Sequence, residues 1–320
     1  MHHTFTTVRR GALLAALALL APATAAQAAP FNPKPGSPVR IERINGGNAT
    51  TVASPKGTVG LRAEFPAPAD GTLEAEVRIA RDGKITHRRT VALEIENGVA
   101  KISTPVKTHT VGTYRVGVRV NGAIVGDIVE FDVLPSRVSA GSSKRSIRMM
   151  QTALIRKKYV LSGTGSLDGH TQRALVAVRK RLGLSREVKF DRALANRLAR
   201  GEGGWTVKYP GHGRHVEADI SLQLLALIGE GGKVERIYPT STGAPATPTI
   251  RGSFKVYRKD LGTNALGMVH SSYFIRGYAI HGYKSVPTYN ASHGCLRVPV
   301  PDAMSIYNWV KYGTIVDVYG

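Results

Sequence analysis

The spacing of apolar residues changes twice along this chain of 320 residues, and this change most narrows the folds open to it. Between about Val39 and Leu134, apolar and polar residues alternate with period two, which places the apolar side chains on one face of a strand. Three dipeptides that suit tight hairpin turns separate these runs: Asp82-Gly83, Asn97-Gly98 and Asn121-Gly122. Short strands with regular turns predict a β-sandwich of the immunoglobulin-like kind over residues 39–135.

The spacing becomes helical after Pro135 to Lys144, a segment rich in Ser, Gly and basic residues that is typical of a linker. Residues at helical spacing mark a first helix: Ile147, Met150, Gln151 and Leu154. A second helix is expected from Thr171, with Gly183 just past its end, and Asp191 can cap a third. We therefore predict a small three-helix module over residues 145–202.

The remainder, residues 207–320, is again rich in strand patterns. Two runs, Val216 to Ile228 and Val234 to Tyr238, flank a glycine-rich turn. A last helix is expected over Pro301 to Trp309, followed by a closing strand at Ile315 to Val318. The chain as a whole is thus predicted to be a multidomain, mainly β protein.

The N-terminal segment has the features of an export signal. Two arginines precede a short apolar run, and Ala26-Gln27-Ala28 fits the small-x-small pattern for cleavage after Ala28. An uncleaved anchor is the alternative, but the run is short for a membrane span and Pro22 interrupts it. We expect a signal peptide at residues 1–28, a location in the bacterial cell wall or periplasmic space, and no stable membrane span after cleavage.

The chain is strongly basic, with 44 Lys and Arg against 22 Asp and Glu. Cleavage of the predicted signal removes two arginines and leaves a net charge of +20. The electrostatic field of such a net positive charge attracts anionic polymers. For an exported protein these are anionic wall polymers rather than nucleic acid. Because the basic residues are dispersed, a general role in solubility and adhesion is an equal alternative.

Cys295 is the single cysteine, so it has no partner for an internal disulfide. An inert buried thiol, an intermolecular bridge and a reactive site are the remaining alternatives. Its neighbours favour the reactive site: it ends the tetrapeptide Ser292-His293-Gly294-Cys295, and His281-Gly282 lies fourteen residues upstream. An imidazole can take the thiol proton, and a glycine beside the nucleophile lets backbone N–H groups approach a reacting carbonyl.

These residues resemble the L,D-transpeptidase family with the YkuD-type catalytic domain. The family pattern is His-Gly, a gap, then Ser/Thr-His-Gly-Cys followed by an apolar residue and arginine, here Leu296-Arg297. Ser241-Thr242-Gly243 and Thr247-Pro248-Thr249 resemble the family's approach to the site, although Ile250-Arg251 is insertion-like. The resemblance covers roughly Val216 to Gly320.

The helical module carries a second, incomplete resemblance. Asp168-Gly169-His170-Thr171, followed by Ala174-Leu175 and Gly183-Leu184, is similar to the peptidoglycan-binding repeat of wall enzymes. That family has an aromatic–glutamine pair where this chain has Val178-Arg179. A structural spacer is the alternative to a binding role.

The L,D-transpeptidase resemblance implies a role for each residue of the motif. Cys295 is the nucleophile, His281 the general base and later the acid, and the Gly282 carbonyl orients His281. The N–H groups of Gly294 and Cys295 form the oxyanion hole. The remaining implied residues are His293 in support, Ser292 shaping the turn, Arg297 holding a substrate carboxylate, and Tyr273 and Met268 lining the pocket.

The implied activity is the cross-linking of third stem-peptide residues of peptidoglycan through a cysteinyl thioester, with release of D-alanine and acylation by carbapenems. Water as acceptor would make the same site an L,D-carboxypeptidase, and a wall-binding protein without catalysis is a further alternative. No cofactor is expected. A metal site built from His270, His281, His293 and Cys295 is disfavoured because His-x-Cys is too tight for common zinc spacing.

Overall fold

The computed structural model describes residues 39–42, 51–52, 58–67, 73–108 and 110–320. The predicted signal peptide, residues 1–28, lies outside the described residues. The described chain divides into two compact units. One contains Gly60–Val106 and Thr113–Glu130, and the other contains Lys107–Gly112 and Phe131–Gly320. Within the described parts, no helix is both long and apolar enough to cross a membrane.

The N-terminal strands form an eight-stranded sheet in the order β1-β3-β6-β5-β4-β7-β8-β2. Their bounds are β1 Val39–Glu42, β2 Thr51–Val52, β3 Thr58–Pro66, β4 Leu73–Arg81, β5 Lys84–Glu96, β6 Val99–Lys107, β7 Gly112–Val120 and β8 Ala123–Val133. The long β5 pairs with β4 along most of its length and with β6 only at Glu94–Glu96. It therefore joins the strands β1, β3 and β6 to the strands β4, β7, β8 and β2. Alternate residues of β6 and β7 are buried, as the period-two pattern predicted.

The three predicted hairpin turns are confirmed. Asp82, Asn97 and Asn121 have φ of 48°, 53° and 48°, and the glycine after each also has positive φ. Two successive residues with positive φ are characteristic of the turn that matches the twist of paired strands. These dipeptides therefore determine where β4–β5, β5–β6 and β7–β8 reverse.

Three helices form the module after β8: α1 Lys144–Arg156, α2 Gly169–Arg181 and α3 Arg192–Ala199. The side chains of Ser143, Asp168 and Asp191 cap them by accepting a backbone N–H three residues on. The second helix begins at Gly169, two residues before the expected Thr171, because its cap is Asp168.

The expected linker at 135–144 is in part a packed segment. Val138 is 8% exposed, and its N–H donates to the carbonyl of Phe190 at 3.1 Å. The segment expected as a linker therefore contains a buried residue that pairs with the helical module. Composition indicates local flexibility but does not reveal that a single valine pairs with a distant segment.

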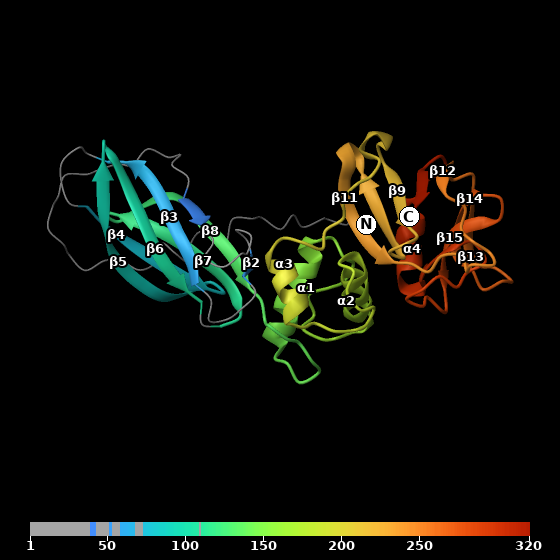
Figure 1. Ribbon diagram of the computed structural model, residues 1–320, viewed down its shortest axis with the longest axis horizontal. Coiled ribbons are helices and arrows are strands. Elements are labelled where there is room, and N and C mark those ends of the chain that lie inside the picture. The colour runs from blue at the N-terminus through green and yellow to red at the C-terminus, as the bar shows by residue number, and fades with distance from the viewer. Residues whose placement is uncertain (1–38, 43–50, 53–57, 68–72, 109) are drawn as a thin grey trace, which may run out of the picture. The chain divides into compact units, whose positions relative to one another are not determined.

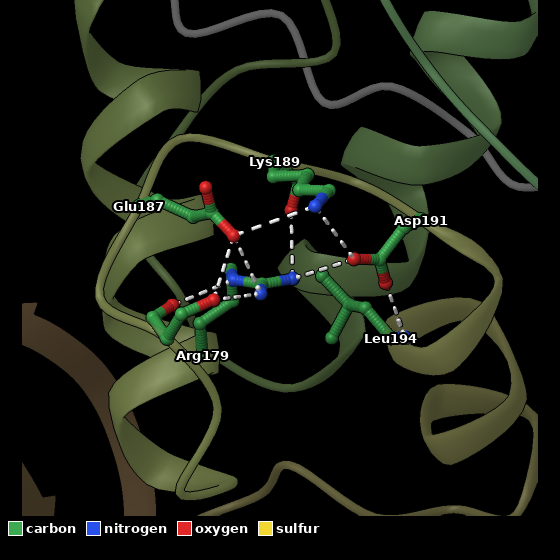
Figure 2. A network of polar contacts seen from close by, with 6 residues as sticks. Arg179, Glu187, Lys189, Asp191 and Leu194 are labelled. Atoms are coloured by element: carbon green, nitrogen blue, oxygen red, sulfur yellow. Dashed lines mark hydrogen bonds and ion pairs between the residues drawn. The ribbon is translucent and has the colours of Figure 1, made fainter.

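Arg179, where the peptidoglycan-binding repeat has a polar amide, organises the connection between α2 and α3 (Figure 2). Its guanidinium is almost fully buried and donates to the carbonyl of Ser185 at 2.8 Å and to carboxylate oxygens of Glu187 and Asp191, both at 3.2 Å. Val178, the other departure from that repeat, is fully buried in the module core. Both departures therefore have structural roles.

The C-terminal region contains two sheets and a helix. The five-stranded sheet has the order β11-β10-β9-β17-β12, and the four-stranded sheet β13-β14-β15-β16. The bounds are β9 His215–Asp219, β10 Leu224–Gly229, β11 Lys233–Pro239, β12 Gly252–Lys255, β13 Arg258–Thr263, β14 Val269–Ile275, β15 Tyr278–Tyr283, β16 Leu296–Pro299, α4 Val300–Trp309 and β17 Ile315–Tyr319, with short 3₁₀ turns at Pro210–His212 and Glu230–Gly232.

The apolar run Val216 to Ile228, expected as one strand, is the hairpin β9–β10. Asp219 begins the turn, and its Oδ1 accepts the N–H groups of Ser221 and Leu222, both at 3.0 Å. A short aspartate side chain can satisfy backbone donors in this way and so start a turn within an apolar run. The mainly β class is confirmed, with four α-helices among the described residues.

Every residue of β10 is buried, because its two faces belong to different cores. Leu225 and Leu227 pack between the two sheets with residues of α4. Leu224, Ala226 and Ile228 pack with the three-helix module. The module is thus docked on the outer face of the five-stranded sheet.

Glu217 anchors the segment that leads from the helices into β9. Its carboxylate is fully buried and accepts the indole N–H of Trp205 at 2.7 Å and the backbone N–H groups of Lys208 and Tyr209 at 2.7 and 2.8 Å. The hydroxyl of Tyr319 donates to the same carboxylate at 3.2 Å. A buried charge with this many donors ties the module and the sheet together.

Candidate active site

The parallel pairing of β15 with β16 brings the two halves of the motif together. His281 lies opposite Arg297, and Ile280 lies opposite Leu296. Paired residues in a sheet point to the same face, and side chains alternate along a strand. Cys295 lies in the bend that directly precedes β16. Its thiol packs against the cluster that contains Ala279, and the charge of Arg297 acts on it. Ala279 and His281 are two residues apart in β15, so their side chains share one face of the strand.

His281 is held in one tautomer. Its ring is 3% exposed, and Nδ1 lies 2.9 Å from the carbonyl oxygen of Gly282. A carbonyl only accepts, so Nδ1 carries the proton and Nε2 keeps a free lone pair. Burial, aided by the nearby charge of Arg297, lowers the pKa of His281 below its usual 6.5. The imidazole is therefore a neutral base at neutral pH.

Gly282 gives His281 this partner and also allows close packing. A Cβ at this position would lie 2.6 Å from Cβ of Ala303 in α4 and 3.1 Å from Cβ of Val269 in β14. Only glycine lets the strand pass between these neighbours without displacement. The orientation of the imidazole thus depends on the packing of α4 and β14 against β15.

The Cys295 thiol is half-buried against Met268, Tyr273 and Ala279. Burial raises the pKa of Cys295 above its usual 9.0, although the Ala279 N–H partly opposes that rise. The resting pair is therefore a neutral thiol and a neutral imidazole, and reaction requires proton transfer. Met268 and Tyr273 are 7% and 5% exposed, so they support the sulfur and leave little surface for a ligand, unlike the expected pocket lining.

Ser292 closes the turn that presents the cysteine. Its hydroxyl donates to the Cys295 carbonyl at 2.6 Å and accepts the Gly294 N–H at 3.1 Å. Gly294 is buried, has φ of +109°, and lies so close to Tyr278 that a Cβ would be 2.6 Å from its ring. The Gly294 N–H, expected in the oxyanion hole, is donated to Ser292 in this structure. Ser292 lies where a turn-shaping residue is needed.

The remaining two motif residues differ in position. The Arg297 guanidinium lies 4.2 Å above the ring of Tyr283, whose edge meets the His281 ring at a centroid distance of 5.7 Å. Arg297 is therefore close enough for its charge to act on the imidazole. His293 is exposed, and the structure does not bring it into the packed part of the site.

The segment Ser241–Gly243, which makes isolated bridges to Arg297 and Ser292, fixes the segment before the cysteine. The Thr242 carbonyl accepts the N–H groups of Ala291 and Ser292 at 2.8 and 2.9 Å, while Ser241 exchanges two 3.0 Å backbone bonds with Arg297. Gln223, nearly fully buried, accepts the Thr242 N–H through its amide oxygen at 2.8 Å. Sequence reasoning missed Gln223; its one signal was a polar residue within an apolar run.

Among the described residues, there is no group of three or more His, Cys, Asp and Glu side chains placed to hold a metal ion. His270, considered as a ligand, instead accepts the backbone N–H of Gly262 at 3.0 Å through Nδ1. It also lies against the ring of Tyr307 at a centroid distance of 5.9 Å.

Comparison with known proteins agrees with the geometry. The family model of the YkuD L,D-transpeptidase catalytic domain matches residues 213–318. An L,D-transpeptidase structure from Xylanimonas cellulosilytica is 30% identical with a TM-score of 0.52, and the match covers 58% of this chain and 98% of that one. The chain belongs to the L,D-transpeptidase family. A search of curated proteins gave no match.

Two further structures of the family are similar at lower scores. The catalytic domain from Enterococcus faecium is 26% identical over 34% of this chain and 98% of its own, with a TM-score of 0.29. The Mycobacterium tuberculosis H37Rv L,D-transpeptidase is 15% identical over 88% of this chain and 98% of its own, with a TM-score of 0.31. Family membership supports L,D-transpeptidase activity, and with it a peptidoglycan substrate and a role at the cell wall.

Proposed function

We propose that this protein is an exported L,D-transpeptidase that cross-links third stem-peptide residues of peptidoglycan through a thioester on Cys295. The observation that supports the proposal is the pairing of β15 with β16, which sets His281 opposite Arg297, two residues after Cys295. The Gly282 carbonyl, 2.9 Å from Nδ1, leaves Nε2 as the atom that can accept a proton.

The reaction begins when His281 Nε2 takes the thiol proton and Sγ attacks the carbonyl carbon of the third stem residue. The amide bond to the terminal D-alanine breaks, and His281 returns the proton to the leaving amine. An amine of a second stem then attacks the thioester, gives its proton to His281, and frees the thiol. Because both groups are neutral at rest, the first transfer is part of the chemical step.

Charge in the intermediate is met by the backbone and by Arg297. We assign the Cys295 N–H to the oxyanion, since the Gly294 N–H is donated to Ser292. Arg297, stacked on Tyr283, holds a carboxylate of the stem peptide. We assign His293, exposed at the rim, to support of the bound substrate.

Export follows from residues 1–28 acting as a signal peptide, which places the mature chain in the cell wall or periplasmic space. The net charge of +20 then favours contact with anionic wall polymers. We take residues 39–135, 145–202 and 207–320 as the three domains of the mature protein.

The test is incubation of the mature protein with defined tetrapeptide muropeptides and analysis of the products by mass. We expect cross-linked dimers and free D-alanine, and a carbapenem adduct on Cys295. A folded Cys295→Ala variant should give neither product nor adduct. If D-alanine is released without dimers, water is the acceptor and the protein is an L,D-carboxypeptidase; if the wild type releases no D-alanine, it is a wall-binding protein without catalysis.

A further inference from the structure

A cavity of about 500 Å³ lies between helix α2 and the segment 283–288, which follows His281 in the chain. We call it the α2 cavity. One side is a single stripe of α2: Gly169, Arg173, Val176 and Lys180, spaced by three or four residues. The opposite face of α2, with Ala174 and Val178, is buried in the module core. The docking of the module therefore creates the cavity.

The polar lining of the α2 cavity is cationic. Arg173, Lys180 and Lys284 line it, and its lining contains no carboxylate. Asp302, 5% exposed, lies behind Arg173 and faces its Nε at 3.6 Å, so it offsets part of the arginine charge. Nη2 of Arg173 lies 2.9 Å from Nδ1 of His170. Arg173 therefore meets a ligand in the cavity through its remaining N–H donors.

The rest of the lining is apolar, with small side chains. Val188 and Val300 are 52% and 41% exposed at the cavity, and Val176, Val286, Pro239 and Pro301 complete the walls. Exposed valines beside cations suit a ligand that combines small apolar groups with carboxylates. A peptide with alanine side chains and free carboxylates has this chemistry.

The α2 cavity adjoins the catalytic residues. Tyr283 lines it, and the same ring meets the His281 ring at 5.7 Å and carries the Arg297 guanidinium at 4.2 Å. Arg186 closes the other end of the segment 283–288, donating to the Thr288 carbonyl at 2.6 Å. A ligand in this cavity therefore touches the segment that joins the catalytic histidine to the cysteine loop.

We propose that the α2 cavity is a second substrate subsite, which binds a carboxylate of a peptidoglycan stem peptide through Arg173 and Lys284. The choice of a stem peptide as ligand rests on the proposed function; the charge and shape of the cavity do not. Lys180 lies deeper, and its ammonium donates to the carbonyls of Gln223 and Thr240 at 3.1 and 3.3 Å. These two bonds hold Lys180 against the sheet at the base of the cavity.

The test uses the mature chain with Cys295→Ala, which prevents turnover, and a stem tetrapeptide carrying a photoreactive group. We expect cross-links to α2 or to residues 283–288, mapped by mass spectrometry. Lys284→Gln, at an exposed position, should remove these cross-links and weaken peptide binding in calorimetry by at least about tenfold. Arg173→Gln should act in the same direction, and amidation of the peptide carboxylates should have a similar effect.

Lys233→Gln is the matched control, because this exposed lysine is at the opposite end of β11 from Pro239, about 20 Å along the strand. It should leave cross-linking unchanged. Cross-links confined to the surroundings of Cys295, and equal in Lys284→Gln, would overturn the proposal. So would binding of a phosphate polymer at the α2 cavity in preference to the peptide. If the wild type is not acylated by a carbapenem while cross-links at α2 persist, the proposed function fails and the subsite stands.

Discussion

Replacement of Gly294 by alanine tests whether the turn before Cys295 depends on a residue without a side chain. Gly294 has φ of +109°, a conformation that L residues with a Cβ rarely adopt. A Cβ there would lie 2.6 Å from two carbons of the Tyr278 ring. The turn or the ring must move to accommodate it.

The loss of stability follows from the backbone strain and from the steric contact with Tyr278. Backbone strain of this kind costs about 1–3 kcal/mol. Overpacking a well-packed site costs about 1–3 kcal/mol more. If the protein relieves the strain by shifting the turn, the thiol moves with it, because Ser292 links the Gly294 N–H to the Cys295 carbonyl. A displacement near 1 Å lowers the rate of a positioned reaction about 100-fold.

The assay is the rate of carbapenem acylation of Gly294→Ala, measured together with the free energy of unfolding. Gly163→Ala is the control, since a Cβ at Gly163 meets no atom within 4 Å. Adding Tyr278→Ala removes the steric contact but not the strain in φ, so the double variant should recover only part of the loss. Acylation of Gly294→Ala at the wild-type rate, with unchanged stability, would refute the reasoning.

Three further predictions concern protonation and packing. The acylation rate should be flat from pH 7 to 8. It should fall as the pH drops through the lowered pKa of His281, below 6.5, and rise above pH 9 as Cys295 ionises. A midpoint above pH 7 on the acid side would contradict the assignment of His281 as the base. Burial lowers the pKa of Lys180 to about 7. The unfolded chain therefore binds more protons at this residue than the folded chain between pH 7 and 10.5. The free energy of unfolding should rise with pH over that range, by about 5 kcal/mol at most. Lys180→Met should abolish that rise in denaturation measurements, and an equal rise in the variant would exclude Lys180 as its cause. Arg179→Met should cost about 3 kcal/mol of unfolding free energy, whereas exposed Arg192→Met should cost almost none; equal losses would contradict the role of the Arg179 network.

Short sequence patterns were sufficient to predict a structural feature where that feature depends on neighbouring residues alone. Asn97-Gly98 and its two counterparts adopt the turns their backbone preferences favour. Asp191 caps the third helix as predicted, because a short carboxylate beside a helix start meets its free N–H groups. The motif around Cys295 indicated the family, and the family model that matches residues 213–318 confirms it.

Long-range packing explains what sequence reasoning missed. The apolar run within Val216 to Ile228 could not show that β10 has a core on each side. Gln223 gave no sign that its amide would hold Thr242, because the two meet only when the β9–β10 turn reaches the segment Ser241–Gly243. The engagement of the Gly294 N–H by Ser292 likewise depends on how the turn closes.

The sequence alone therefore determined the mainly β class, the hairpin turns and the cap of the third helix, and it singled out Cys295 and His281, since each of these signals lies in residues close together in the chain. Only the tertiary structure decided what surrounds the thiol, which group engages the Gly294 N–H, and where the helices dock. These depend on strand pairing and packing between distant segments. Burial of the same segments also moves the pKa values of His281 and Cys295 away from those of free side chains.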